Sequence, residues 1–260
     1  DKKEGMDMSK KVYHPEMTYT VFKEGKFNKA IFGVGSAENH GFHLPFGNDT
    51  LVSHALAMAV AQKLDGMLVL PPVNIGVSYH YDDFPFTLTL RPEVLIEVLK
   101  DMLNSTIRQG INRIIIINGH DGNIAPIEIA ARSVKVANPE AFIASLDAWW
   151  VKAGELLPQD TFEVWSGLGH AGEGETSISL YLFPELCQIK EAQGVIPDLP
   201  EGLDIKWKFN EITPYGATGD PTKGTAEKGK KMFDALVDYI VHSIQELEKN
   251  QWKYGVMLKM

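Results

Sequence analysis

Short apolar segments alternate with longer helical stretches along this chain of 260 residues. The apolar segments are rich in β-branched residues and are followed by glycine, proline or polar residues, which is typical of strands buried on both faces. Such strands need helical connections that cover both faces of a parallel sheet. We therefore predict an α/β fold with a mostly parallel sheet. The expected strands are residues 29–35, 67–70, 113–118 and 141–146, and the expected helices are residues 50–64, 92–109, 125–137, 176–182 and 226–249.

The size and composition of the chain suit one large domain over residues 1–260. Hydrophobic residues make up 44% of the sequence and aromatic residues 10%, which is enough to bury a sizeable core. The 25 Lys and Arg residues against 34 Asp and Glu residues give a net charge of -9, which repels phosphate backbones and anionic lipid surfaces. We expect a small-molecule substrate, and neither nucleic acid nor a membrane as partner.

Cysteine usage and hydropathy bear on the compartment. Cys187 is the only cysteine, so no internal disulfide can form. It lies among apolar residues, with no neighbour in sequence that would activate its thiolate. The longest apolar runs are far shorter than the roughly 20 residues that cross a bilayer. These features predict a cytoplasmic protein whose cysteine serves packing.

Imidazole and carboxylate side chains gather at three places, each bracketed by glycine. The first group follows the expected strand 29–35, the second lies in the turn Asn-Gly-His-Asp-Gly-Asn after the strand 113–118, and the third precedes the helix 176–182. In parallel sheets, loops at the carboxyl ends of strands converge into one crevice. The residues concerned are Glu38, His40 and Asp49, then His120, then His170, Glu173 and Glu175.

These residue types are those that a divalent cation such as zinc requires. Glu38 and His40 point the same way if their backbone is extended, so both can reach one cation or a pair of cations. Asp49 has two carboxylate oxygens and can bridge two metals lying about 3.5–4 Å apart. The pattern predicts a metal-dependent hydrolase.

Each group also has a simpler interpretation. Asp49 can cap the helix that follows it, and Glu38 can be a solvated surface residue. His120 can lie on an ordinary tight turn, and the third group can be a loop whose acids favour the positive end of a helix. A serine or cysteine nucleophile is disfavoured, because Ser36 lacks a Gly-x-Ser-x-Gly elbow and Cys187 has no acid–base partner nearby in sequence.

Three ordered motifs resemble the creatininase (creatinine amidohydrolase) family. They are residues 35–45 followed by Asp49 and Thr50, then residues 118–123, then residues 170–177, and the resemblance runs from about residue 30 to 185. The turn at residues 219–221 and Glu227 also look similar to the family. The resemblance implies a three-layer α/β/α fold, a dinuclear divalent metal centre, and hydrolysis of a C–N bond in a small cyclic or linear amide by metal-activated hydroxide. It also implies a homo-oligomer, commonly a hexamer.

The resemblance assigns roles residue by residue. Glu38 and His120 correspond to ligands of one metal, His40 to a ligand of the other, and Asp49 to the bridge. Creatininase itself has a further acid where this chain has Gly122, and we expect Glu173 to replace it. The remaining two residues of the third motif, His170 and Glu175, correspond to the catalytic histidine and to the acid that orients it or ligates a metal. Zinc is the favoured metal, with manganese and iron as alternatives.

The substrate pocket departs from the pattern of creatininase. Asp121 stands where the creatinine-cleaving enzyme has an aromatic residue, which argues against creatinine as substrate. We expect Asp121, His80, Trp149 and Trp150 to contact the substrate, although core packing explains the two tryptophans equally well. A deformylase, a hydrolase of a cyclic sugar-derived ketone and a non-catalytic metal-binding protein stay open as alternatives.

Overall fold

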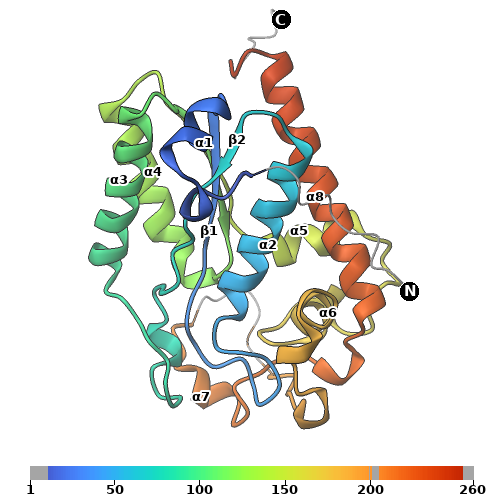
Figure 1. Ribbon diagram of the computed structural model, residues 1–260. Helices are drawn as coiled ribbons and strands as arrows, with labels where there is room; N and C mark the ends of the chain where they lie inside the picture. Colours follow the sequence, from blue (N-terminus) through green and yellow to red (C-terminus); the bar gives the residue numbers. More distant parts are fainter. Residues whose placement is uncertain (1–10, 199, 201–204, 254–260) are drawn as a thin grey trace, which may run out of the picture.

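A four-stranded parallel sheet forms the centre of the computed structural model, which describes residues 11–198, 200 and 205–253 (Figure 1). The strand order is β2-β1-β3-β4, and every neighbouring pair is parallel. The predicted mostly parallel sheet is therefore confirmed. Its strands are β1 (Lys29–Val34), β2 (Met67–Val69), β3 (Arg113–Asn118) and β4 (Phe142–Leu146).

Helices cover both faces of the sheet, which confirms the three-layer arrangement (Figure 1). The α3 and α4 helices lie on one face, and α2 and α8 lie on the other together with α5 and α6. None of the described helices is long and apolar enough to cross a membrane. The helices are α1 (Tyr19–Glu24), α2 (Asn48–Lys63), α3 (Pro92–Arg108), α4 (Ile124–Ala137), α5 (Trp149–Leu156), α6 (Glu173–Leu182), α7 (Phe209–Ile212) and α8 (Ala226–Lys249).

The sheet separates two apolar cores, because successive side chains of each strand point to opposite faces. Ile115 and Ile117 of β3 pack on the α2 and α8 side, whereas Ile114 and Ile116 pack on the α3 and α4 side. A strand buried on both faces needs apolar residues at every position, and the isoleucine run meets that need. At the carboxyl end of β3, the apolar core ends and buried polar side chains begin.

Close packing of α6 against α8 fixes the third motif. Gly229 permits it, because a Cβ atom at this position would lie 1.9 Å from the carbonyl oxygen of Ser177. The backbone N–H of Thr225 also donates to Ser177 Oγ over 3.1 Å. The start of α8 is therefore held against the first turns of α6.

The observed bounds differ from the predicted ones where glycine obscures the pattern. β3 and α8 have their predicted bounds, but α6 begins at Glu173 rather than at residue 176. Glu173 and Glu175 thus belong to a helix and not to the loop before it. The predicted domain includes residues 1–10 and 254–260, which lie outside the described residues.

Candidate metal centre

Six buried or nearly buried side chains meet at the carboxyl ends of β1 and β3. Two follow β1, one lies in the first turn of α2, one follows β3, one directly precedes α6, and one lies in the first turn of α6. Exposure is 8% or less for five of them, and the side chain of the sixth, His170, is 11% exposed. The six are Glu38, His40, Asp49, His120, His170 and Glu175.

The potential ligand atoms of these side chains form three groups, each with all its atoms within 4.8 Å of one another. Glu38, Asp49 and His120 make one group, and His40, Asp49 and Glu175 make the second. The third consists of Glu38, His40 and His170. Because Asp49 belongs to the first two groups, its two oxygens face two separate sets of donors.

Asp49 is not the cap of α2. Gly47 is the N-cap residue of α2, and no side chain caps the helix there. Asp49 Oδ1 lies 2.7 Å from His40 Nε2, and its Oδ2 accepts a hydrogen bond from Ser36 Oγ over 2.7 Å. Gly119 lets the end of β3 approach, since a Cβ atom there would lie 2.4 Å from the carbonyl oxygen of Asp49. This contact brings His120 to within 3.3 Å of Asp49 Oδ2.

Backbone carbonyls orient the two ligand-type imidazoles. The far ring nitrogen of His120, Nε2, lies 2.9 Å from the carbonyl oxygen of Val77, to which it donates. Nδ1 of the same ring then points at Glu38 Oε1, 3.1 Å away. His40 is held similarly, with Nδ1 3.2 Å from the carbonyl oxygen of Glu38 and Nε2 turned towards Asp49. Metal-ligating histidines are commonly fixed by such hydrogen bonds from the second nitrogen.

The orphaned carboxylate of Glu38 tests whether these residues fit a metal. Glu38 is 0% exposed, yet no described group makes a hydrogen bond to either of its oxygens. A buried carboxylate without donors is strongly unfavourable. His120 Nδ1 faces it without hydrogen-bonding geometry, so the lone pairs of both groups point at a common volume. A divalent cation would satisfy them all, and the set of imidazole and carboxylate donors suits one.

Electrostatics in the cluster favour a positive charge. Burial is the largest single influence and would lower the pKa of His40, but attraction to and hydrogen bonding with Asp49, together with attraction to Glu175 and Glu38, raise that pKa to about 9. Burial likewise acts to lower the pKa of His120, and the Glu38 and Asp49 carboxylates raise it well above its usual value. The carboxylates that raise these two pKa values would also attract a divalent cation. Burial raises the pKa of Glu175 to about 7.

His170 differs from the other two imidazoles. Burial, followed by repulsion from His40, lowers its pKa well below the usual value, so the ring is neutral. Its Nε2 lies 2.6 Å from the carbonyl oxygen of Asn39, and its Nδ1 lies 3.9 Å from Glu38 Oε1. The rings of Tyr81 and Phe209 pack on it at centroid distances of 4.4 and 5.1 Å. His170 is thus a fixed neutral imidazole at the edge of the cluster.

Glu173 lies outside the cluster, and our expectation that it completes the ligand set is wrong. Its carboxylate accepts hydrogen bonds from the backbone N–H groups of Glu163 and Val164 and pairs with Lys228. Residues two positions apart on a helix face directions about 200° apart. Once α6 begins at Glu173, only one of the two acids can face the metal-type residues. That acid is Glu175, whose Oε2 also accepts a hydrogen bond from the N–H of Ala171 over 2.6 Å.

A cavity of about 250 Å³ opens beside the cluster. Two predicted substrate residues, Asp121 and Trp150, line it, whereas His80 stacks on the ring of His120 at a centroid distance of 5.5 Å. The prediction for Trp149 is wrong, because this side chain is 0% exposed and belongs to the α2 and α8 core. The cavity is also lined by residues that we did not predict as site residues, namely Tyr81, Gly119, Val151, Leu168 and Gly169. Apart from Gly119, which belongs to the second motif, none of them carries a sequence signal beyond its place in a loop or short helix.

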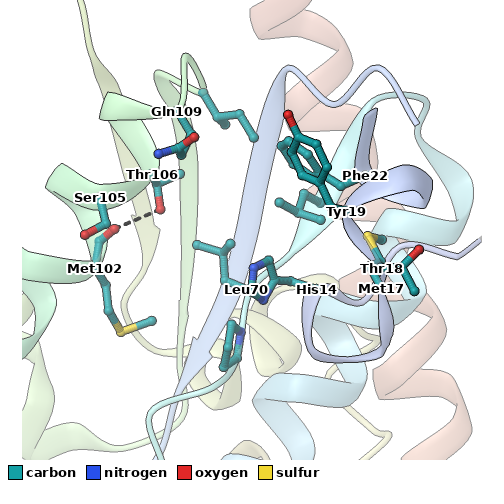
Figure 2. Close-up of a pocket in the computed structure, with 13 residues that line it drawn as sticks. His14, Met17, Thr18, Tyr19, Phe22, Leu70, Met102, Ser105, Thr106 and Gln109 are labelled. Carbon is teal, nitrogen blue, oxygen red and sulfur yellow. Dashed lines mark hydrogen bonds between the residues drawn. The ribbon is translucent and has the colours of Figure 1, made fainter. Parts of the chain in front are cut away.

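A second cavity lies against the edge strand β2, between α1 and the end of α3 (Figure 2). Its volume is about 520 Å³, and most of its wall is apolar, including Tyr19, Leu70 and Met102. Among the described residues that line it, His14 is the only one with an imidazole and none carries a carboxylate. This larger cavity therefore lacks the donors that a metal needs.

The chain is similar in sequence to known hydrolases. The creatininase family, described as creatinine amidohydrolase, matches residues 15–244. A 3-dehydro-scyllo-inosose hydrolase from Thermotoga maritima is 32% identical over 91% of this chain and 83% of its own length. A creatinine amidohydrolase from Pseudomonas putida is 27% identical over 92% of this chain and 98% of its own. A mycofactocin precursor peptide peptidase from Mycobacterium ulcerans is 29% identical over 82% and 83%.

Solved structures of creatininases are also similar to this chain. A creatininase with manganese has a TM-score of 0.77 and 25% identity, covering 91% of this chain and 98% of its own. A mutant creatininase of Zn–Zn type has the same score, identity and coverage. Since the family match spans most of the sequence and one relative is 32% identical over 91% of it, this chain belongs to the creatininase family of hydrolases.

Proposed function

We propose that the chain is a divalent-metal-dependent hydrolase that cleaves a C–N bond of a small cyclic or linear amide. The observation that carries this proposal is the buried Glu38 carboxylate, which has no hydrogen-bond partner among the described residues and lies among imidazole and carboxylate donors. The cavity beside it holds the neutral imidazole of His170. A metal-binding cluster next to a free base is the arrangement that hydrolysis needs.

The geometry supports a specific division of ligands between two cations. Glu38 and His120 would hold one, His40 and Glu175 would hold the other, and Asp49 would bridge them. Zinc is the favoured metal, with manganese and iron as alternatives, and the related creatininase structures hold manganese or zinc. When bound, the pair supplies Lewis-acid chemistry, which polarises a carbonyl group and lowers the pKa of water towards about 7.

His170 would carry the proton during the reaction. Its Nε2–H donates to the carbonyl oxygen of Asn39, which leaves Nδ1 with a lone pair towards the cluster. Nδ1 can take a proton from the attacking water and return it to the departing nitrogen as the C–N bond breaks. Tyr81 and Phe209 pack on the ring and hold its orientation.

The cavity restricts the substrate to a small molecule. Its volume of about 250 Å³ is small for a ligand site. Trp150 offers an apolar surface to a ring, and the Asp121 carboxylate can accept hydrogen bonds from N–H or O–H groups. His80 stacks beside His120 and can contact a polar substituent of the substrate.

Ring opening of a cyclic sugar-derived ketone is the second candidate activity. Two observations favour it: the 32% identity to 3-dehydro-scyllo-inosose hydrolase, and the acidic residue Asp121 in the cavity wall. A carboxylate at this place suits a substrate rich in hydroxyl groups.

An assay on panels of substrates tests both candidates. Protein loaded separately with zinc, manganese and iron(II) would be offered lactams, formamides, linear amides and cyclic polyhydroxy ketones. Turnover of an amide supports the first candidate, and turnover of the ketones alone replaces it by the second. His170→Ala should keep both metals and lose at least about a hundredfold in kcat. Bound metal without turnover of any class would instead favour a metal-binding protein.

We also propose a homo-oligomeric, cytoplasmic protein with one domain over residues 1–260. Large apolar side chains exposed near the site support assembly, with exposed fractions of 56% for Phe42, 47% for Phe46, 84% for Phe86 and 53% for Leu88. The single cysteine, Cys187, can form no internal disulfide, which suits a reducing compartment, and burial raises the pKa of its thiol to about 11. Light scattering of the purified protein tests the assembly, and a monomeric mass would contradict it.

A further inference from the structure

The loop that carries His170 has an unfavourable backbone conformation. Trp165 and Ser166 have φ angles of 46° and 54°, in the left-handed region that residues with a side chain disfavour. Ala171 follows with a φ angle of 49°. A loop with three such residues needs contacts from the rest of the fold to keep its shape.

The carboxylate of Glu173 supplies such contacts. Its Oε2 accepts hydrogen bonds from the backbone N–H groups of Glu163 and Val164, both over 2.9 Å. These residues directly precede the left-handed pair. Glu173 is 0% exposed, so the hydrogen bonds are shielded from water and are stronger than they would be at the surface.

Lys228 of α8 provides the countercharge. Its Nζ donates to Glu173 Oε1 over 2.6 Å, and its side chain is only 17% exposed. The same ammonium group donates to the carbonyl oxygen of Lys223 over 3.1 Å and lies 3.3 Å from Glu163 Oε1. A buried carboxylate needs a partner of this kind, because an unpaired one would be strongly unfavourable. Glu173 and Lys228 therefore connect the loop, α6 and α8.

The anchored loop forms one wall of the cavity. Leu168, Gly169 and His170 line it, a few residues beyond the Glu163 and Val164 amides that Glu173 holds. We propose that Glu173 and Lys228 are a positioning pair, which sets the place of this wall and of His170 without binding metal or substrate. This inference rests on the proposed function for its kinetic consequence but not for its structural one.

Two variants test the pair, each with a matched control. Glu173→Gln keeps the size of the side chain but leaves one acceptor oxygen, which can accept from the loop N–H groups or from Lys228 but not from both, and it removes the charge that pairs with Lys228. We expect two bound metals as in the wild type, faster hydrogen exchange at residues 163–169, and a roughly tenfold or larger loss in kcat. Glu163→Gln is the control, since Glu163 is an exposed partner of the same lysine, and it should leave kcat within about twofold.

A second pair of variants separates charge from shape. Lys228→Met should reproduce the faster hydrogen exchange and the lower kcat of Glu173→Gln. Lys228→Arg, which keeps the charge, should retain most of the slow exchange and most of the kcat of the wild type. All assays would be run well below the unfolding temperature of each variant, so that a change in overall stability does not alter kcat.

Two results would overturn the role of Glu173 and Lys228, and a third would contradict only the proposed function. Loss of metal from Glu173→Gln, as expected from Glu175→Gln, would make Glu173 a ligand and overturn the proposal. Normal exchange in residues 163–169 would also overturn it, even if the unfolding temperature fell. If the wild type turned over no substrate, the proposed function would fail, while metal content and hydrogen exchange would still decide whether Glu173 and Lys228 position the loop.

Discussion

The two cavities at opposite ends of the sheet differ in chemistry more than in size. The cavity near the end of α3 measures about 520 Å³ and has a mostly apolar wall, whereas the cavity beside the metal-type cluster measures about 250 Å³ and includes Asp49, His120, His170 and Glu175. Of these two, volume alone would favour the apolar cavity as the candidate site. The buried Glu38 carboxylate, which lacks a hydrogen-bond partner among the described residues, points instead to the smaller cavity. A buried charge without a partner is so unfavourable that it implies a compensating cation.

The largest expected effect separates two carboxylates of the smaller cavity. Asp49→Asn should lose both metals and at least about a thousandfold in turnover, because a neutral amide cannot bridge two cations as a carboxylate does. Asp121→Asn is the matched control, since Asp121 lines the same cavity but belongs to none of the ligand groups. It should keep both metals and change mainly KM. Elemental analysis and steady-state kinetics measure both, and full metal content in Asp49→Asn would refute the bridge.

A smaller effect concerns pH and the polar end of the sheet. His43 is buried there, with Nε2 2.9 Å from Thr176 Oγ1, and burial followed by repulsion from His40 lowers its pKa to about 4. The unfolded chain takes up a proton on this histidine below about pH 6.5, whereas the folded chain does so only near pH 4. His43 therefore makes the folded state less stable as the pH falls through that window.

His43→Gln removes this proton uptake. The free energy of unfolding of the variant should depend less steeply on pH between about 6.5 and 4 than that of the wild type, as measured by urea denaturation at several pH values. Identical slopes for the two proteins would contradict the expectation.

The smallest effect should come from the apolar cavity. Met102 is partly buried there, so Met102→Ala should lower the free energy of unfolding by about 1–2 kcal/mol, less than the roughly 2–5 kcal/mol of a fully buried methionine. Because the change lies at the other end of the sheet, kcat/KM should stay within about twofold. A large loss of activity in this stably folded variant would show that the two ends are coupled.

Elements with strong local signals could be predicted from the sequence. The isoleucine run of β3 ends in Asn-Gly, and α8 begins after Thr225, whose side chain caps it by accepting from the N–H of Lys228. Both signals are local, so both bounds were correct. The α5 helix was not expected, because its eight residues include two tryptophans and a glycine, and its packing against α8 compensates for their low helix propensity.

In the candidate site too, features set by local sequence could be predicted, and features set by packing could not. Residue types and spacing predicted ligand-type residues after β1 and β3, and the structure brings their side chains together because loops at the carboxyl ends of parallel strands converge. They could not decide between Glu173 and Glu175, since that choice depends on where α6 begins and how it is rotated against α8. Nor could they separate Trp149 from its neighbour Trp150, which point in directions about 100° apart on α5.

The origin of the cavity wall has an evolutionary consequence. The ligand-type residues lie at strand ends and in the first turns of helices, where the core fixes them. The rest of the wall comes largely from η3 (Asp121–Asn123), from α5 and from the loop before α6, which also carries His170. Mutations in η3 and α5 can reshape the accepted substrate while leaving the ligand-type residues and His170 in place. Such independence is one way in which a single ancestral scaffold can give rise to relatives named for a peptide, an inosose and creatinine.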